Sequence, residues 1–126
     1  MILFVDDDQD LAGMILLGLT SPKNSQRIGF RTIRYYYEPR EALDFVHKVV
    51  SGEVLVRDGI ELVITDYDMP GMNGAELATE IRKVLPDVPI LFHTGTHKKI
   101  EYFENSFIRK KGCSITDLIN DIEELI

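Results

Sequence analysis

Aspartates that could hold a metal ion stand at two places in the sequence. Asp6 to Asp8 follow the first apolar run, and Asp66 follows a later one. Carboxylates held close together repel one another unless a cation lies between them, and a set of oxygen ligands suits Mg²⁺ much better than zinc. If the fold brings these side chains together, we expect Mg²⁺ at Asp6, Asp7 and Asp66.

Asp66 could then act as an oxygen nucleophile toward a phosphoryl group. Beside the metal its carboxylate stays ionised, and its attack on phosphorus would give an acyl phosphate. The Lys110 ammonium would offset the charge of the transferred group, and the Thr94 hydroxyl could donate a hydrogen bond to one of its oxygens. Phosphorylation adds about −1.5 to −2 charges, which can pull Thr94 inward and reorganise the loop that follows it. We therefore expect a switch that is driven by electrostatics.

Short apolar runs alternate with helical patterns along the chain. Five runs are rich in β-branched or aromatic residues and too short for helices, so they predict strands at Ile2–Val5, Thr32–Tyr36, Leu62–Ile64, Ile90–Phe92 and Phe107–Ile108. Apolar residues at helical spacing predict helices at Leu11–Leu19, Ala42–Val49, Leu77–Leu85 and Leu118–Ile126. A further short helix is expected between the last two strands. The longer segments Thr20–Gly29 and Ser51–Gly59 are expected to be surface loops.

This alternation predicts a doubly wound α/β fold. Right-handed crossovers place each helix over a parallel sheet, so helices should cover both faces. Ligands of such sheets bind beyond the carboxyl ends of the strands. The candidate residues stand at those ends, and we expect one crevice to collect Asp6 to Asp8, Asp66, Thr94 and Lys110.

The run from Asp66 to Gly74, Asp-Tyr-Asp-Met-Pro-Gly-Met-Asn-Gly, is the most specific motif in the sequence. Together with Val5-Asp6-Asp7, Thr94-Gly95 and Phe107-Ile108-Arg109-Lys110, it resembles the receiver domain of two-component response regulators over essentially the whole chain. The resemblance implies a flavodoxin-like five-stranded parallel sheet in the order 2-1-3-4-5. It also implies phosphotransfer to the first aspartate of the run from a sensor histidine kinase, a phosphotransfer protein or a small phosphodonor such as acetyl phosphate. A downstream protein target would respond to the switch.

The resemblance also assigns roles to individual residues. Asp7 would bind Mg²⁺ directly, and Asp6 would act mostly through water. Asp66 would be metal ligand and phosphoacceptor together. The backbone carbonyl of Asp68 would supply a further ligand.

Two features depart from the family's pattern. Thr94, which matches the switch hydroxyl, and Phe107, which matches the switch aromatic residue, are 13 positions apart, several fewer than is usual. We therefore expect the fourth helix to be shortened and residues 97–103 to form a different surface. Lys111 stands where the family favours a proline after the lysine of the site, and we expect a trans peptide bond there. The spacing from Phe107 favours Lys110 over Lys111 as the lysine that enters the crevice.

Composition and charge limit the remaining classes of function. The 126 residues suit one domain, with 44% hydrophobic and 28% charged residues, and we expect a receiver domain over 1–126 without an output domain. The net charge of −7 argues against direct nucleic-acid binding. The longest apolar stretch, Leu11 to Leu19, is too short for a membrane span. A single cysteine, Cys113, favours a reducing compartment, so we expect a cytoplasmic protein. Formation of a homodimer is a further possibility.

Two other functions stay open. Asp66-Tyr67-Asp68 also fits the nucleophile and general acid of haloacid dehalogenase-like phosphohydrolases, although that motif normally follows a first strand, with its acidic metal ligands downstream. A receiver-like adaptor that works without phosphorylation is the third interpretation, and the shortened fourth helix is its only motive. The main interpretation makes the protein a signalling switch and not an enzyme, because only its own phosphorylation and dephosphorylation would be promoted.

Overall fold

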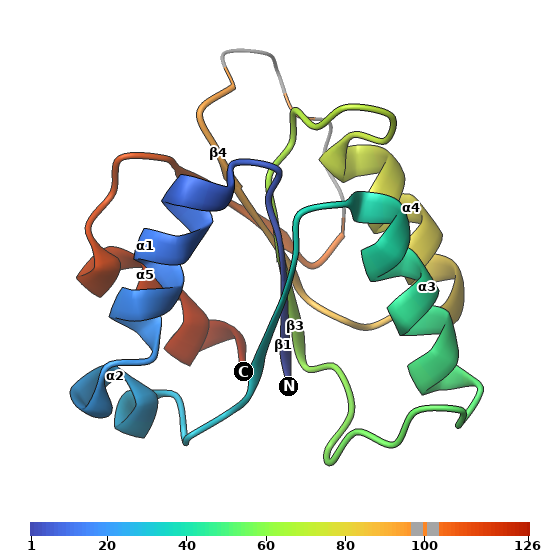
Figure 1. Ribbon diagram of the computed structural model, residues 1–126, viewed down its shortest axis with the longest axis horizontal. Helices are drawn as coiled ribbons and strands as arrows, with labels where there is room; N and C mark the ends of the chain where they lie inside the picture. The colour runs from blue at the N-terminus through green and yellow to red at the C-terminus, as the bar shows by residue number, and fades with distance from the viewer. Residues whose placement is uncertain (97–99, 101–103) are drawn as a thin grey trace.

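The computed structural model describes residues 1–96, 100 and 104–126, and Figure 1 shows helices on both sides of a central sheet. The sheet has five parallel strands in the order β2-β1-β3-β4-β5. The strands are β1 Ile2–Val5, β2 Ile33–Tyr36, β3 Leu62–Thr65, β4 Ile90–Thr94 and β5 Ser106–Lys110. The predicted doubly wound, flavodoxin-like fold and its strand order are therefore confirmed.

Two layers of helices enclose this sheet. Helices α1 and α5 lie together on one face, with α2 beside them, and α3 and α4 cover the other face (Figure 1). Their bounds are α1 Gln9–Leu19, α2 Pro22–Arg27, α3 Pro39–Val50, α4 Gly74–Val84 and α5 Ile115–Leu125. The longest of these has 12 residues, and no helix within the described residues is long and apolar enough to cross a membrane.

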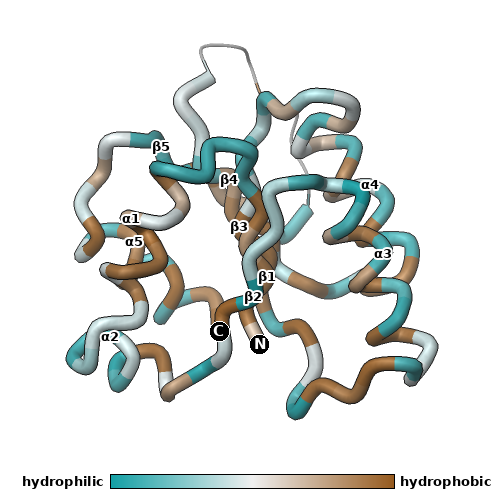
Figure 2. The backbone as a smooth tube through the Cα atoms, viewed as in Figure 1, coloured by the Kyte–Doolittle hydropathy of each residue, from teal (hydrophilic) through white to brown (hydrophobic). Residues whose placement is uncertain are grey.

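Side chains alternate along each strand and divide the core into two parts. On β1, Leu3 and Val5 pack in the part under α3 and α4, whereas Ile2 and Phe4 pack in the part under α1 and α5. Figure 2 shows the apolar residues gathered along the central strands and on the helices that cover them. Asp6 continues the series of Ile2 and Phe4, because residues two positions apart share a face. The same alternation decides which residues can meet beyond the strand ends.

The structure adds one helix that the sequence did not predict. Helix α2 interrupts the segment 20–29, which was expected to be a loop. It begins after Ser21, whose hydroxyl oxygen accepts a hydrogen bond from Asn24 N, and Pro22 occupies its first position. The other predicted loop, 51–59, contains no helix or strand.

Two predictions concern the last part of the sheet. The short helix predicted between β4 and β5 falls largely on residues 97–99 and 101–103, which lie outside the described residues, and so does the surface predicted there. The peptide bond between Lys110 and Lys111 is trans, as predicted.

Candidate functional site

Three carboxylates meet beyond the carboxyl end of the sheet. Asp6 follows β1 and Asp66 follows β3, its neighbour in the sheet, and one oxygen from each of Asp6, Asp7 and Asp66 lies within 4.8 Å of the others. The backbone holds them there, because Asp66 N donates a hydrogen bond to the Val5 carbonyl, 2.9 Å away. The structure thus brings together three of the four aspartates that were predicted to converge, whereas Asp8 caps α1 by accepting a hydrogen bond from Leu11 N at 3.1 Å.

Burial gives these carboxylates different environments. Asp7 is exposed, whereas Asp6 and Asp66 are buried. Burial raises the pKa of Asp6, and a hydrogen bond from Asp8 N at 2.9 Å opposes that rise. Asp6 Oδ2 forms an ion pair with the Lys111 ammonium at 3.2 Å, and no other described group donates a hydrogen bond to it. Buried polar atoms are usually paired, so this oxygen, together with the oxygens of Asp7 and Asp66, suits a hard cation such as Mg²⁺.

The ammonium group at the acidic cluster belongs to Lys111, and the prediction that Lys110 enters the crevice is wrong. Lys111 Nζ lies 3.0 Å from Asp66 Oδ2 and 3.2 Å from Asp6 Oδ2. Lys110 Nζ donates instead to the Thr96 carbonyl at 3.2 Å. Burial opposes the charged form of Lys111, but the two carboxylates raise its pKa above the usual value, so it stays an ammonium ion.

Alternation along β5 explains why the second lysine takes this place. In the pairing of β4 with β5, Thr94 lies opposite Lys110. The preceding residue, Arg109, points to α5, where its guanidinium donates two hydrogen bonds to the Asp121 carboxylate at 2.6 and 2.7 Å. Lys111 follows Arg109 to that face, because residues two positions apart share a face, and Lys110 points to the other.

The same pairing separates the two residues that were predicted to move together. Thr94 is buried at the end of β4, and its Oγ1 accepts a hydrogen bond from Thr96 N at 3.1 Å. Phe107 lies opposite Leu91, so it points to the other face of the sheet and is 44% exposed. The predicted pair of Thr94 and Phe107 is therefore not formed. Ile108 occupies the face that Thr94 shares.

The loop after β3 is held against Asp66. Tyr67 N donates to Asp66 Oδ1 at 2.7 Å, and Gly74 N donates to the Tyr67 carbonyl at 2.7 Å. A side chain at Gly74 would overlap the Asp66 carbonyl oxygen, so α4 can begin this close only with glycine. Asp68 lines a surface hollow together with Asp7. That its carbonyl binds the metal stays a prediction.

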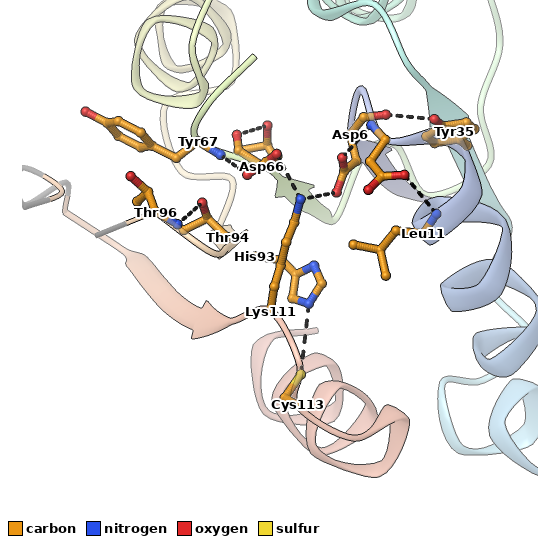
Figure 3. Close-up of polar contacts among 12 residues, drawn as sticks. Asp6, Leu11, Tyr35, Asp66, Tyr67, His93, Thr94, Thr96, Lys111 and Cys113 are labelled. Carbon is orange, nitrogen blue, oxygen red and sulfur yellow. Dashed lines mark hydrogen bonds and ion pairs between the residues drawn. The ribbon is translucent and has the colours of Figure 1, made fainter. Parts of the chain in front are cut away.

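Tyr35 and His93 also border the site, although no functional role was predicted for them from the sequence. The Tyr35 hydroxyl donates to the Asp6 carbonyl at 2.7 Å, and burial raises its pKa, with a further rise from Asp6 and its neighbours. His93 is 3% exposed and lies beside the Lys111 side chain, with Nε2 directed to Cys113 Sγ at 3.9 Å (Figure 3). His93 could have been identified from the sequence, because it stands one residue before Thr94 at the end of a strand. Alternation along that strand places it on the same face as the acidic cluster.

Comparison with known proteins identifies the family of the chain. Residues 2–115 match the response regulator receiver domain family. The chain is 34% identical over 103 residues to YrkP, an uncharacterized transcriptional regulatory protein of Bacillus subtilis (strain 168), which covers 82% of this chain and 37% of that protein. It is 25% identical over 130 residues to the response regulator receiver protein CpdR of Brucella abortus (strain 2308), which covers 99% and 95% of the two chains.

Solved structures agree on the fold. A two component transcriptional regulator AraC from Clostridium phytofermentans ISDg superimposes with a TM-score of 0.79 at 22% identity, over 99% of this chain and 90% of that one. The receiver domain of the hybrid histidine kinase CckA gives a TM-score of 0.75, also at 22% identity, over 98% and 96%. The chain spans only 10% to 37% of the length of the first three curated relatives.

Proposed function

Because the chain belongs to the response regulator receiver domain family of two-component signalling, we propose that it accepts a phosphoryl group on Asp66 with the help of Mg²⁺ and then controls a partner protein. The meeting of Asp6, Asp7 and Asp66 with the Lys111 ammonium is the observation that carries this proposal. It combines a nucleophile, a set of metal ligands and a compensating positive charge in one place.

Asp66 is well prepared to act as the nucleophile. Tyr67 N donates to its Oδ1 and the Lys111 ammonium to its Oδ2, which fixes the plane of the carboxylate. One carboxylate oxygen would form the new bond to phosphorus while the bond from phosphorus to the donor's leaving group breaks, which gives an acyl phosphate. Lys111 would then follow the negative charge from the carboxylate to a phosphoryl oxygen.

Asp6, Asp7 and Asp66 are the residues that would hold Mg²⁺, with the Asp68 carbonyl as a further ligand. When bound, the ion would supply the positive charge that lets an anionic phosphoryl group approach three carboxylates. The oxygens of these three carboxylates, which lie within 4.8 Å of one another, support this assignment.

We propose Thr94 as the switch residue. Phe107, which was first expected to move with it, has no role in this proposal. The Thr94 hydroxyl oxygen already accepts a hydrogen bond from Thr96 N, and its own hydrogen can be donated to a phosphoryl oxygen. A shift of Thr94 toward the site would pull on the segment that begins at Thr96, which Lys110 ties to β5. The charge on Asp66 would in this way alter the surface beside β4 and β5.

Proteins are the proposed partners on both sides of this switch. A sensor histidine kinase or a phosphotransfer protein would donate the phosphoryl group, and a downstream protein would bind one state of the domain. The net charge of −7 supports a protein target over nucleic acid. A reducing cytoplasmic location is consistent with the single cysteine.

The two alternatives have less support. Asp66 follows the third strand of the chain and its acidic partners come from the first, which is the reverse of the order expected for haloacid dehalogenase-like phosphohydrolases. An adaptor independent of phosphorylation gains no support from an intact acidic cluster with its own ammonium ion.

Phosphorylation can be tested directly by mass. Incubation with acetyl phosphate and Mg²⁺ should add the mass of one phosphoryl group, and Asp66→Asn or removal of Mg²⁺ with a chelator should prevent the addition. Persistence of the added mass in Asp66→Asn would move the acceptor elsewhere. Repeated turnover of a phosphate ester would instead favour the phosphohydrolase, and equal partner affinity with and without beryllofluoride would favour the adaptor.

A further inference from the structure

We propose that His93 is a positioning residue for the Lys111 ammonium group, an inference that rests on the proposed phosphoryl site. His93 is the fourth of five residues in β4. Thr65 lies opposite Phe92 in the pairing of β3 with β4, so the residues that follow them, Asp66 and His93, are side by side on one face. That face also carries Lys111.

One nitrogen of the imidazole has a contact and the other has none. Nε2 lies 3.9 Å from Cys113 Sγ, whereas Nδ1 is buried and has no hydrogen-bond partner within the described part of the chain. Figure 3 shows the ring beside the Lys111 side chain, with Nε2 turned to Cys113 and the opposite edge turned toward the acidic cluster. A buried nitrogen without a partner, next to ionised groups, requires a physical explanation.

The charges around the ring favour one arrangement of its hydrogen. Burial lowers the pKa of His93, and the nearby Lys111 ammonium lowers it further against a smaller opposing effect of Asp66. A hydrogen on Nε2 can be donated to Cys113 Sγ and leaves a lone pair on Nδ1. Beside an ammonium ion, a lone pair is the favourable choice.

Lys111 has a hydrogen to give to this lone pair. Its ammonium carries three hydrogens, of which one is donated to Asp66 Oδ2 and one can be directed to Asp6 Oδ2 at 3.2 Å, so a third remains. When the ammonium turns to an oxygen of the phosphoryl group, it loses part of its contact with the carboxylates. We infer that Nδ1 of His93 then accepts a hydrogen from the ammonium and holds it at the site.

Two substitutions separate the nitrogen from the volume of the ring. His93→Asn retains a side-chain oxygen close to the place of Nδ1, and His93→Leu fills similar space without an acceptor. We expect His93→Leu to slow phosphorylation by acetyl phosphate about five- to tenfold and His93→Asn to change it less than about twofold. Mg²⁺ affinity should change less than about twofold in both, since a residue acting through Lys111 adds no metal ligand. Equal slowing in both variants would overturn the proposal.

A double-mutant cycle tests whether His93 acts through Lys111. In the background of Lys111→Met, replacing His93 with Leu should cause no further loss of rate, because the residue that it positions is gone. Independent losses that multiply would show that His93 acts on the fold alone. Thermal unfolding of each variant identifies any that fail to fold. If His93→Leu does not fold, His93→Asn still provides a test.

The ¹⁵N resonance of the Lys111 ammonium separates this inference from the proposed function. Measured with beryllofluoride bound, it should shift in His93→Leu and stay close to its original position in His93→Asn, whether or not acetyl phosphate phosphorylates the protein. If the original protein takes up no phosphoryl group, the proposed function fails and the resonance still tests the contact. An unchanged resonance in His93→Leu would overturn the positioning role even in a protein that is phosphorylated normally.

Discussion

Lys111 Nζ lies 3.0 Å from Asp66 Oδ2, although the two residues are 45 positions apart in the sequence. The preceding residue, Lys110, reaches the Thr96 carbonyl instead. Two consecutive lysines therefore serve different parts of the same site, one at the carboxylates and the other at the segment after β4.

Replacing each lysine in turn should separate these roles. Lys111→Ala should weaken beryllofluoride binding at least about tenfold, because the positive charge that offsets the phosphoryl oxygens is lost. Lys110→Ala, its matched control, should retain binding within about threefold, since an exposed side chain that holds a carbonyl contributes little. Titration followed by isothermal calorimetry measures both. If Lys110→Ala weakened beryllofluoride binding more than Lys111→Ala, Lys110 would be the lysine of the site, as its spacing from Phe107 first suggested.

The close approach of α4 to Asp66 should make Gly74 sensitive to a single methyl group. Gly74→Ala would force the Asp66 carbonyl away and should destabilise the protein by about 1 to 3 kcal/mol, as overpacked sites do. Gly13→Ala is the matched control, because Gly13 lies in α1 with open space around it. It should stabilise the protein by up to about 1 kcal/mol through better helix propensity. Urea unfolding compares the two, and equal effects would contradict the steric argument.

Arg82 should be more important for stability than its half-buried position suggests. Its guanidinium donates to the backbone carbonyls of Val88, Glu104 and Asn105 at 2.7 to 2.9 Å, which ties α4 to the starts of β4 and β5. Arg82→Ala should lower the free energy of unfolding by about 2 kcal/mol, because several hydrogen bonds to a charged group are lost together. Lys83→Ala, which removes only an exposed pair with Glu80, should change it by less than about 0.5 kcal/mol.

Glu61 should give the protein a stability that depends on pH. A hydrogen bond from Arg31 at 2.7 Å lowers the pKa of Glu61 below its usual value. The folded state therefore binds this proton less readily than the unfolded state, so the stabilisation is present above the usual carboxyl pKa and is lost as pH falls through the lowered value.

Replacement of Glu61 with Gln measures this contribution. At pH 7 the variant should be less stable by about 1 kcal/mol, because a partly exposed pair is screened by water. The difference from the original protein should shrink as the pH is lowered from about 5 toward 3. Urea unfolding at several pH values provides the comparison, and a difference that does not vary with pH would contradict the ion pair as its source.

Much of the fold followed from short apolar runs, because β1, β3 and β4 consist of buried residues, most of them apolar. The acidic cluster followed as well, since Asp6 and Asp66 come directly after buried strands that are neighbours. Helix α2 was missed because its six residues include no buried one, so no apolar periodicity marks it. Its Ser-Pro start, at residues 21–22, was the only signal.

The choice of lysine failed for a different physical reason. Strand β5 is at the edge of the sheet, and its two apolar residues are both exposed, Phe107 by 44% and Ile108 by 55%. Hydrophobic alternation therefore does not reveal which residues of β5 face the core, and spacing from an aromatic residue was a poor substitute. The contact of Arg109 with Asp121 settles the facing, but it joins segments whose packing the sequence does not reveal.

The division of roles between Lys110 and Lys111 depends on the register of β5. An inserted or deleted residue before Lys110 would turn every later side chain through half a revolution, as a slip of one residue does in any strand. Lys110 would then face the carboxylates, and Lys111 would face the segment after β4. Because both residues are lysines, the chemistry would be preserved, although each role would pass to the other lysine.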